Sequence, residues 1–189
     1  MDRFNDVQLK DKNLQQNPIG VGLYEYAEFV RCDFSGVDLR GFSFTECDFI
    51  GCDLSNANVH GVSFREVNFR ECKLLGLDFE QCDAFGLGFR FDNCQLNYSN
   101  FSNTKLKKMH FKDCKLIQVD FTGTDLTEAR FESCDLLDAI FEQTTLEGAD
   151  LSSAFHYSFD PSRNKVRKMK VAEAGLYGLV AGFGIVVGR

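Results

Sequence analysis

A large apolar residue, in most cases Phe or Leu, recurs every five residues over more than half of this chain. The series runs from Phe29 to Phe89 and, after a shift of two residues, from Leu96 to Leu151. Two positions before each member lies a small or medium residue such as Cys32, and the residue between is often Asp or Asn. A period of five fits neither a helix nor a strand. It predicts a short extended step and then a corner, so that the chain coils into a square tube with the apolar residues inside.

The cysteines indicate the length of one coil. All eight occupy the small inward position, and six of them form a series with spacings of 20, 20, 22, 20 and 20 residues. That series is Cys32, Cys52, Cys72, Cys94, Cys114 and Cys134. Four repeats therefore make one coil, and stacked coils lie about 4.8 Å apart, as neighbouring strands do. We expect an all-β fold of about six coils, in which reduced thiols fill the core as small apolar groups.

The repeat divides the chain into three parts. Residues 1–26 are expected to be an N-terminal lead-in, residues 27–154 the solenoid, and residues 155–189 a C-terminal segment. The two-residue shift in register lies within 88–93, where we expect a short loop. Loops on rigid scaffolds often bind partners. The candidate contact residues of this loop are Arg90, Phe91 and Asp92, with Arg90 and Phe91 directed outward.

The C-terminal segment is expected to cap the tube. Asp160 and Pro161 are typical of a helix start, apolar residues follow at helical spacing, and 185–187 is typical of a short strand. The end of a solenoid is an open sheet edge and needs a cap. This segment carries more apolar surface than one cap uses, so we also expect it to pair with a second copy about a two-fold axis. The candidate dimer contacts are Ala174, Leu176, Leu179, Phe183, Ile185 and Val187.

The sequence shows no motif for catalysis. The three histidines, His60, His110 and His156, lie near no serine or cysteine nucleophile motif, and no nucleotide-binding or zinc-protease motif occurs. A tube packed with Phe has no cavity for a substrate. We therefore expect a protein that is not an enzyme and uses no cofactor or metal. Without an apolar leader or an 18-residue apolar stretch, we expect a cytoplasmic protein that does not enter a membrane.

Charge is distributed unevenly along the chain. The net charge of the whole chain is −7; residues 29–154 carry 21 acids and 12 bases, or −9, and residues 155–189 carry 2 acids and 6 bases, or +4. Folding the sequence at 20 residues per coil places five acids and one base, Arg40, on one side of the tube. We expect this side to bind the partner. Its candidate residues are Asp38, Asn58, Asp78, Glu80, Asn100, Asp120 and Glu142.

Individual repeats resemble those of the pentapeptide-repeat family. The clearest examples are Cys32-Asp33-Phe34-Ser35-Gly36, Cys52-Asp53-Leu54-Ser55-Asn56 and Ala149-Asp150-Leu151-Ser152-Ser153. The resemblance covers about residues 27–154 and implies a right-handed quadrilateral parallel β-helix.

The tail from Asp160 to Gly188 is similar to that of the microcin-immunity and quinolone-resistance members of this family. Those members are dimers that imitate DNA, bind DNA gyrase or topoisomerase IV, and protect the enzyme from poisons such as fluoroquinolones or a peptide toxin. The resemblance therefore implies a bacterial cytosolic homodimer that binds a topoisomerase and contacts no nucleic acid directly. The chain differs from the plasmid-borne quinolone-resistance members because it lacks their long projecting loops, and only the shift at 88–93 corresponds to one.

Two other functions remain open from the sequence. A solenoid of this kind can serve as a structural or regulatory scaffold that binds another protein. Identifying the partner that the chain binds would distinguish this scaffold from a topoisomerase-binding protein. Ice binding needs a flat, outward ladder of threonines. Thr104, Thr124 and Thr144 do stack, but at the inward position.

Overall fold

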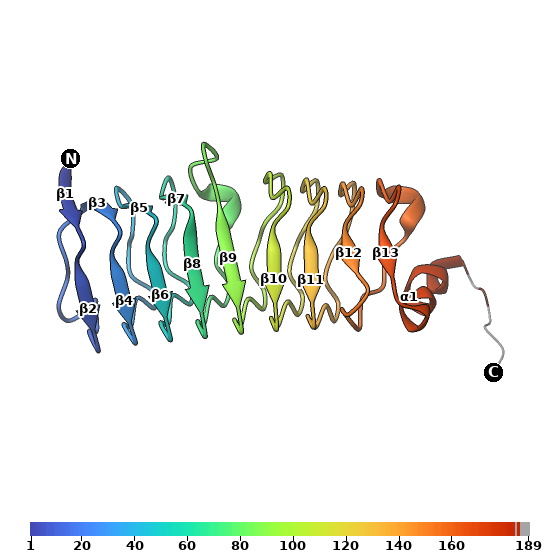
Figure 1. The fold of residues 1–189 in the computed structure, drawn as a ribbon, viewed down its shortest axis with the longest axis horizontal. Coiled ribbons are helices and arrows are strands. Elements are labelled where there is room, and N and C mark those ends of the chain that lie inside the picture. Colours follow the sequence, from blue (N-terminus) through green and yellow to red (C-terminus); the bar gives the residue numbers. More distant parts are fainter. Residues whose placement is uncertain (184, 186–189) are drawn as a thin grey trace.

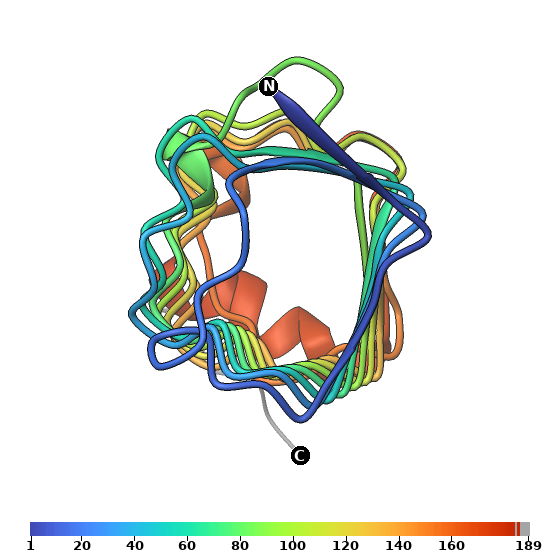
Figure 2. The same ribbon diagram turned by 90° about the vertical axis from the view of Figure 1, so that its left-hand side faces the viewer.

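The computed structural model describes residues 1–183 and 185 and shows a straight rod (Figure 1). Every pair of neighbouring strands is parallel, with equivalent residues 20 positions apart in most coils. Seen along the rod, the coils superpose into an outline with four sides (Figure 2). The predicted fold class, a quadrilateral parallel β-helix, is confirmed.

Two sides of the rod contain regular strands. A four-stranded sheet has the order β1 (Asp2–Asn5), β3 (Gly22–Glu25), β5 (Ser43–Thr45) and β7 (Ser63–Arg65). We call the outer surface of the second, nine-stranded sheet the strand face. In chain order its strands are β2 (Gln8–Lys10), β4 (Glu28–Val30), β6 (Asp48–Ile50), β8 (Val67–Arg70), β9 (Phe89–Asp92), β10 (His110–Lys112), β11 (Arg130–Glu132), β12 (Asp150–Leu151) and β13 (Lys170–Val171).

The solenoid is longer than predicted, with about eight turns instead of about six. Strand β1 pairs with β3 and β2 pairs with β4, so residues 1–26 form the first coil and not a separate lead-in. The period of five does continue there through Phe4, Leu9, Leu14, Ile19 and Tyr24, although the polar residues around them obscure it. At the other end the pairing of β12 with β13 carries the solenoid past residue 154.

Stacked aromatic rings fill the tube. Under the strand face the rings of Phe69, Phe91 and Phe111 stack with centroids 5.4 Å apart at each step. A second ladder follows from the predicted coil of 20 residues with its two-residue shift: successive centroids from Phe79 to Phe141 lie 4.4, 5.5 and 5.2 Å apart. Offset stacking of this kind adds to the free energy gained by burying the rings.

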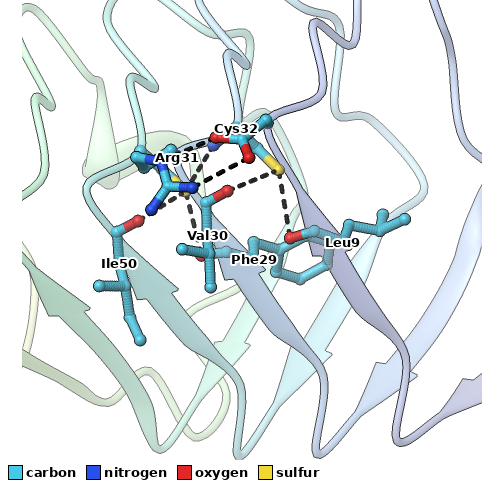
Figure 3. Close-up of polar contacts among 8 residues, drawn as sticks. Leu9, Phe29, Val30, Arg31, Cys32 and Ile50 are labelled. Carbon is cyan, nitrogen blue, oxygen red and sulfur yellow. Dashed lines mark hydrogen bonds and ion pairs between the residues drawn. The ribbon is translucent and has the colours of Figure 1, made fainter.

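The inward cysteines have a role that the repeat alone does not reveal. Cys32 Sγ lies 3.5 Å from the carbonyl oxygen of Leu9 in the preceding coil and 3.6 Å from that of Val30 (Figure 3). Cys52 Sγ approaches the Phe29 carbonyl at 3.2 Å, and Thr124 Oγ1 donates to the Phe101 carbonyl at 2.8 Å. A thiol or hydroxyl here therefore donates an additional hydrogen bond to an inward carbonyl, since the Phe101 carbonyl also accepts the Thr104 N–H at 3.2 Å.

The C-terminal cap packs tightly on the last coil. It consists of helix α1 (Leu176–Val180) between the 3-10 turns η3 (Glu173–Gly175) and η4 (Ala181–Phe183). Gly178 lies against Tyr157, where a Cβ atom would be 1.9 Å from the Tyr157 carbonyl oxygen. Ser158 Oγ also donates to the Gly178 carbonyl at 3.1 Å. The helix start predicted at Asp160 is only a 3-10 turn, η2 (Pro161–Arg163), after which the chain returns to the solenoid.

Candidate partner-binding surface

The predicted acidic side forms a stacked column in the structure. Bridges join Asp38 to Asn58, Asp78 to Asn100, and Asn100 to Asp120, so these five residues follow one line along the rod. We call them the acidic column. Glu80 lies two residues after Asp78, beside this line. Glu142 lies two residues after Ile140, which a bridge to Asp120 places next on the same line.

Most members of the acidic column also support a corner of the coil. A side-chain oxygen accepts a hydrogen bond from the backbone N–H two residues later at Asp38, Asn58, Asn100 and Asp120, over distances of 2.8 to 3.2 Å. Asp78 makes no such bond, because the chain after it forms a 3-10 turn, η1 (Phe79–Gln81). Side-chain caps of this type stabilise turns. Asp78 is therefore the one member of the acidic column whose carboxylate is free of a role in the corner.

Ion pairs neutralise the two ends of this side. The Arg40 guanidinium lies 2.6 Å from Asp38 and, by hydrogen bonding, lowers the pKa of that carboxyl. Arg163 lies 2.9 Å from Glu142. Among residues 1–183 and 185, no Lys, Arg or His nitrogen lies within 4.0 Å of the carboxylates of Asp78, Glu80 or Asp120. On this side of the rod, the uncompensated negative charge is therefore concentrated near the middle.

Two asparagines bind the central carboxylates. Asn100 Nδ2 donates to Asp78 at 2.9 Å and to Glu80 at 3.1 Å, and Asn103 Nδ2 donates to Glu80 at 2.8 Å. These amides hold Glu80 in place without neutralising it. The sequence did not reveal Arg163, because the predicted solenoid ended at residue 154. It did not reveal Asn103 either, because the direction of a side chain that reaches the next coil is not encoded in the repeat.

The loop prediction was wrong in its position. The pairs Val67–Phe89 and Phe69–Phe91 show that the register has already shifted by two residues at β9, so the insertion lies between η1 and Phe89. Phe91 is buried in the aromatic ladder and does not point outward. Arg90 and Asp92 remain accessible, but on the strand face. The sequence placed the shift too late because Phe89 still continues the first series of five-residue repeats, whereas Phe91 already fits the second. Both residues are inward, so the pattern alone does not show that the extra residues come before Phe89.

The true insertion carries an exposed aromatic residue, Phe85. Its side chain is 77% exposed, and the Arg65 guanidinium carbon lies 5.3 Å from its ring centroid. Asp83 accepts the Phe85 backbone N–H at 3.0 Å and lies 3.8 Å from Arg65. Gly86, with φ of +74°, allows the tight turn that follows. The loop therefore presents Phe85 to solvent in a defined position, and the sequence signal for it was the Phe85-Gly86-Leu87-Gly88 segment.

Comparisons with known proteins identify the repeat. A family model described as a pentapeptide repeat region matches residues 42–116 and 62–141, which together cover more than half of the chain. The chain belongs to the pentapeptide-repeat family. No curated protein matches the sequence.

Among solved structures, this pentapeptide-repeat protein is similar to two trypsin-treated variants of QnrB1, described as a plasmid-mediated fluoroquinolone resistance protein. The TM-score is 0.65 for both, with 21% and 22% sequence identity. The matches cover 98% and 97% of this chain and 100% and 98% of the QnrB1 chains. At this level of identity the similarity shows a shared fold.

The tail of this pentapeptide-repeat protein divides the predicted dimer residues into two groups. Leu179 is buried in the core cluster, so it is a capping residue. Leu176, Phe183 and Ile185 are each about half exposed, and Ala174 is exposed. Val187, and with it most of the predicted strand 185–187, lies outside the described residues.

The interior offers no reactive group. All eight cysteines are buried and unpaired, and burial raises the pKa of the Cys82 thiol to about 12. A thiol with such a pKa is a poor nucleophile at neutral pH. No cluster of three metal-ligating side chains occurs in the part of the chain that the structure describes. Nor does any helix of the described residues have the length and apolar character to cross a membrane.

Proposed function

We propose that this pentapeptide-repeat protein is a non-enzymatic imitation of a DNA duplex. It binds a type II topoisomerase, DNA gyrase or topoisomerase IV, in the cytoplasm and protects the enzyme from poisons such as fluoroquinolones or a peptide toxin. The observation that carries this proposal is the uncompensated acidic group of Asp78, Glu80 and Asp120 in the middle of a straight rod. A groove that binds duplex DNA is basic, because it must neutralise phosphates.

The imitation of DNA is partial in charge. A duplex carries one charge per about 1.7 Å of its axis, whereas coils repeat every 4.8 Å or so and two of the five residues in the acidic column are amides. Affinity must therefore come from further contacts as well. The similarity to QnrB1 supports the choice of partner, since that protein is described as a fluoroquinolone resistance protein.

The tail supplies a dimer contact in this proposal. The side chains of Leu176, Phe183 and Ile185 are about half exposed, and the cap, to which the first two belong, lies at one end of the rod (Figure 1). Burying them against a second copy about a two-fold axis removes apolar surface from water. Two rods joined in this way double the length of acidic surface that a DNA-binding groove can contact.

A second candidate function, a scaffold for another protein, is favoured by Phe85. Imitation of a duplex does not require an exposed aromatic residue, whereas aromatic anchors are typical of protein interfaces. In the first function Phe85 adds an apolar contact to the topoisomerase; in the second it is the main anchor for a different partner.

The test is a gyrase supercoiling assay with and without a fluoroquinolone, in the presence of increasing amounts of the protein. We expect the protein to bind gyrase and to restore supercoiling in the presence of the drug. The variant Asp78→Asn should weaken both effects, since it removes one uncompensated charge and no turn cap. Asp113→Asn removes the same charge from a distant, exposed corner and should leave both effects unchanged.

The outcomes of this assay distinguish duplex imitation from binding as a scaffold. No binding to gyrase or topoisomerase IV at micromolar concentrations would contradict the first function. If binding occurs and responds to Phe85→Ala but not to Asp78→Asn, the protein binds as an apolar scaffold and not as a duplex imitation.

A further inference from the structure

The strand face carries a second charge pattern, separate from the acidic column. The strand register places one outward residue of each strand in a single central line. From β2 to β13 this line reads Gln8, Glu28, Asp48, Asn68, Arg90, His110, Arg130, Asp150 and Lys170. The line changes sign between β8 and β9: the acids of β4 and β6 lie on one side, and the bases of β9, β10 and β11 on the other.

Several of these charges have no partner within the chain. Among residues 1–183 and 185, no oppositely charged group lies within 4.0 Å of Glu28, Arg90 or Arg130. Asp48 is paired with Arg70 at 3.3 Å, and His110 with Glu132 at 3.0 Å. Beyond Arg130, Asp150 and Lys170 pair with each other at 3.6 Å. Glu28 and Arg130, the outer members of the two groups that meet at the sign change, therefore remain available to a partner.

We propose that the strand face binds the strand face of a second copy of this chain, with the two rods side by side and antiparallel. A two-fold axis that lies between the two faces, parallel to the strands and level with the gap between β8 and β9, exchanges the acidic and basic halves. It places Glu28 opposite the partner's Arg130, and Asp48 opposite the partner's His110. The central line is thus self-complementary, as a two-fold interface requires.

Self-association explains this face better than a basic DNA-binding groove does. The bases on β9, β10 and β11 would be repelled by the groove that suits the acidic column. The same bases fit the acidic half of an identical face, with the same rise of roughly 4.8 Å from strand to strand in both copies. Such a contact between polar side chains belongs to the weak class of interfaces and should depend on ionic strength.

This inference is independent of topoisomerase binding and of the tail contact. The exposed tail residues lie at one end of the rod, whereas the sign change lies near its middle (Figure 1). One molecule can therefore use both surfaces at once. To separate the strand-face contact from the tail contact, the test uses full-length protein that carries Phe183→Asp. This substitution places a charge in the tail contact and leaves the strand face unchanged.

The test is sedimentation equilibrium of this protein at about 50 mM and about 500 mM salt, a range over which charge screening increases strongly. We expect concentration-dependent dimers at low salt that dissociate at high salt. Arg130→Glu and Glu28→Arg should each lower the association constant at least tenfold, because each creates two like-charge pairs across the two-fold axis. The double variant, with both charges exchanged, should restore association.

A matched control is Lys115→Glu, which makes the same change of charge on a different side of the rod. It should leave the association constant unchanged. The proposal is overturned if the protein stays monomeric at low salt, if the single variants associate as well as their parent, or if the double variant associates no better than the singles. Melting curves establish that each variant is folded.

Discussion

Asp120 and Phe121 are neighbours in the chain, yet they belong to two regions that differ in kind. Phe121 is fully buried and stacks between Phe101 and Phe141 in a ladder whose members share nearly the same surroundings. The acidic column outside has the same period but unequal members: Arg40 neutralises Asp38, and Asp78 caps no turn. Packing therefore determines which residues occupy the inward positions. The outward residues differ from coil to coil, so only they can specify a partner.

Thiol reactivity should show the largest contrast between inside and outside. All eight cysteines are buried, and burial raises the pKa of Cys47 to about 11. Native protein at pH 8 should react with a thiol reagent about a thousand times more slowly than unfolded protein, because reaction requires an opening that costs several kcal/mol. Stopped-flow titration with and without denaturant measures this ratio. Several fast thiols in the native protein would contradict the ladder.

Two neighbouring substitutions should differ strongly in their effect on stability. Phe121→Ala removes one ring from the buried ladder and should lower the free energy of unfolding by about 3–5 kcal/mol. Thr122→Ala changes a side chain at the surface and should cost less than about 0.5 kcal/mol. Urea denaturation of both variants measures the difference. Equal unfolding midpoints would disprove the assignment of inward and outward positions.

Within the acidic column, Asp120 and Asp78 should also differ. Asp120→Ala removes the cap on the Thr122 N–H and should cost about 1 kcal/mol, by analogy with caps at helix termini. Asp78→Ala removes no turn cap and should cost less than about 0.5 kcal/mol. Thermal unfolding of the two variants measures the difference in their loss of stability. A larger loss for Asp78 would show that its bond to Asn100 matters more than the cap.

The smallest effect should come from acid. Hydrogen bonds from the Ser35 hydroxyl and N–H lower the pKa of Asp33, and the Ser152 N–H and hydroxyl do the same for Asp150. A carboxyl whose folded pKa is lowered contributes stability above its unfolded pKa of about 3.9 and loses it as the pH falls through the folded pKa. The urea midpoint should therefore decrease from pH 5 to pH 2.5. Asp33→Asn, which cannot titrate, should show a smaller decrease.

The sequence predicted the regular part of the fold well for a physical reason. In a coil of four five-residue repeats, each inward side chain packs against the equivalent side chain of the next coil. The spacing of Phe and Cys in the sequence therefore shows which residues stack on one another. The ladder from Phe79 to Phe141 and the acidic column were both predicted in this way. The first coil was missed because Gln, Asn and Pro surround its apolar residues, not because the period fails there.

The irregular parts could not be predicted from the period. Phe89 and Phe91 both suit an inward position, so the pattern cannot show on which side of them the extra residues lie. Only the pairing of β8 with β9 resolves this, and it moves the loop to Phe85. Contacts between coils, such as that of Arg163 with Glu142, depend on long side chains whose direction no repeat encodes.

The central claim is that the charge in the middle of the acidic column binds the topoisomerase. The most direct test measures the melting temperature and the gyrase affinity of one variant, Asp78→Lys with Asp120→Lys. We predict a loss of affinity of at least tenfold, greater at low salt than at high salt. The melting temperature should fall by only about 2–4 °C, which corresponds to one lost turn cap in a chain of this size. Unchanged affinity in this well-folded variant would contradict the claim.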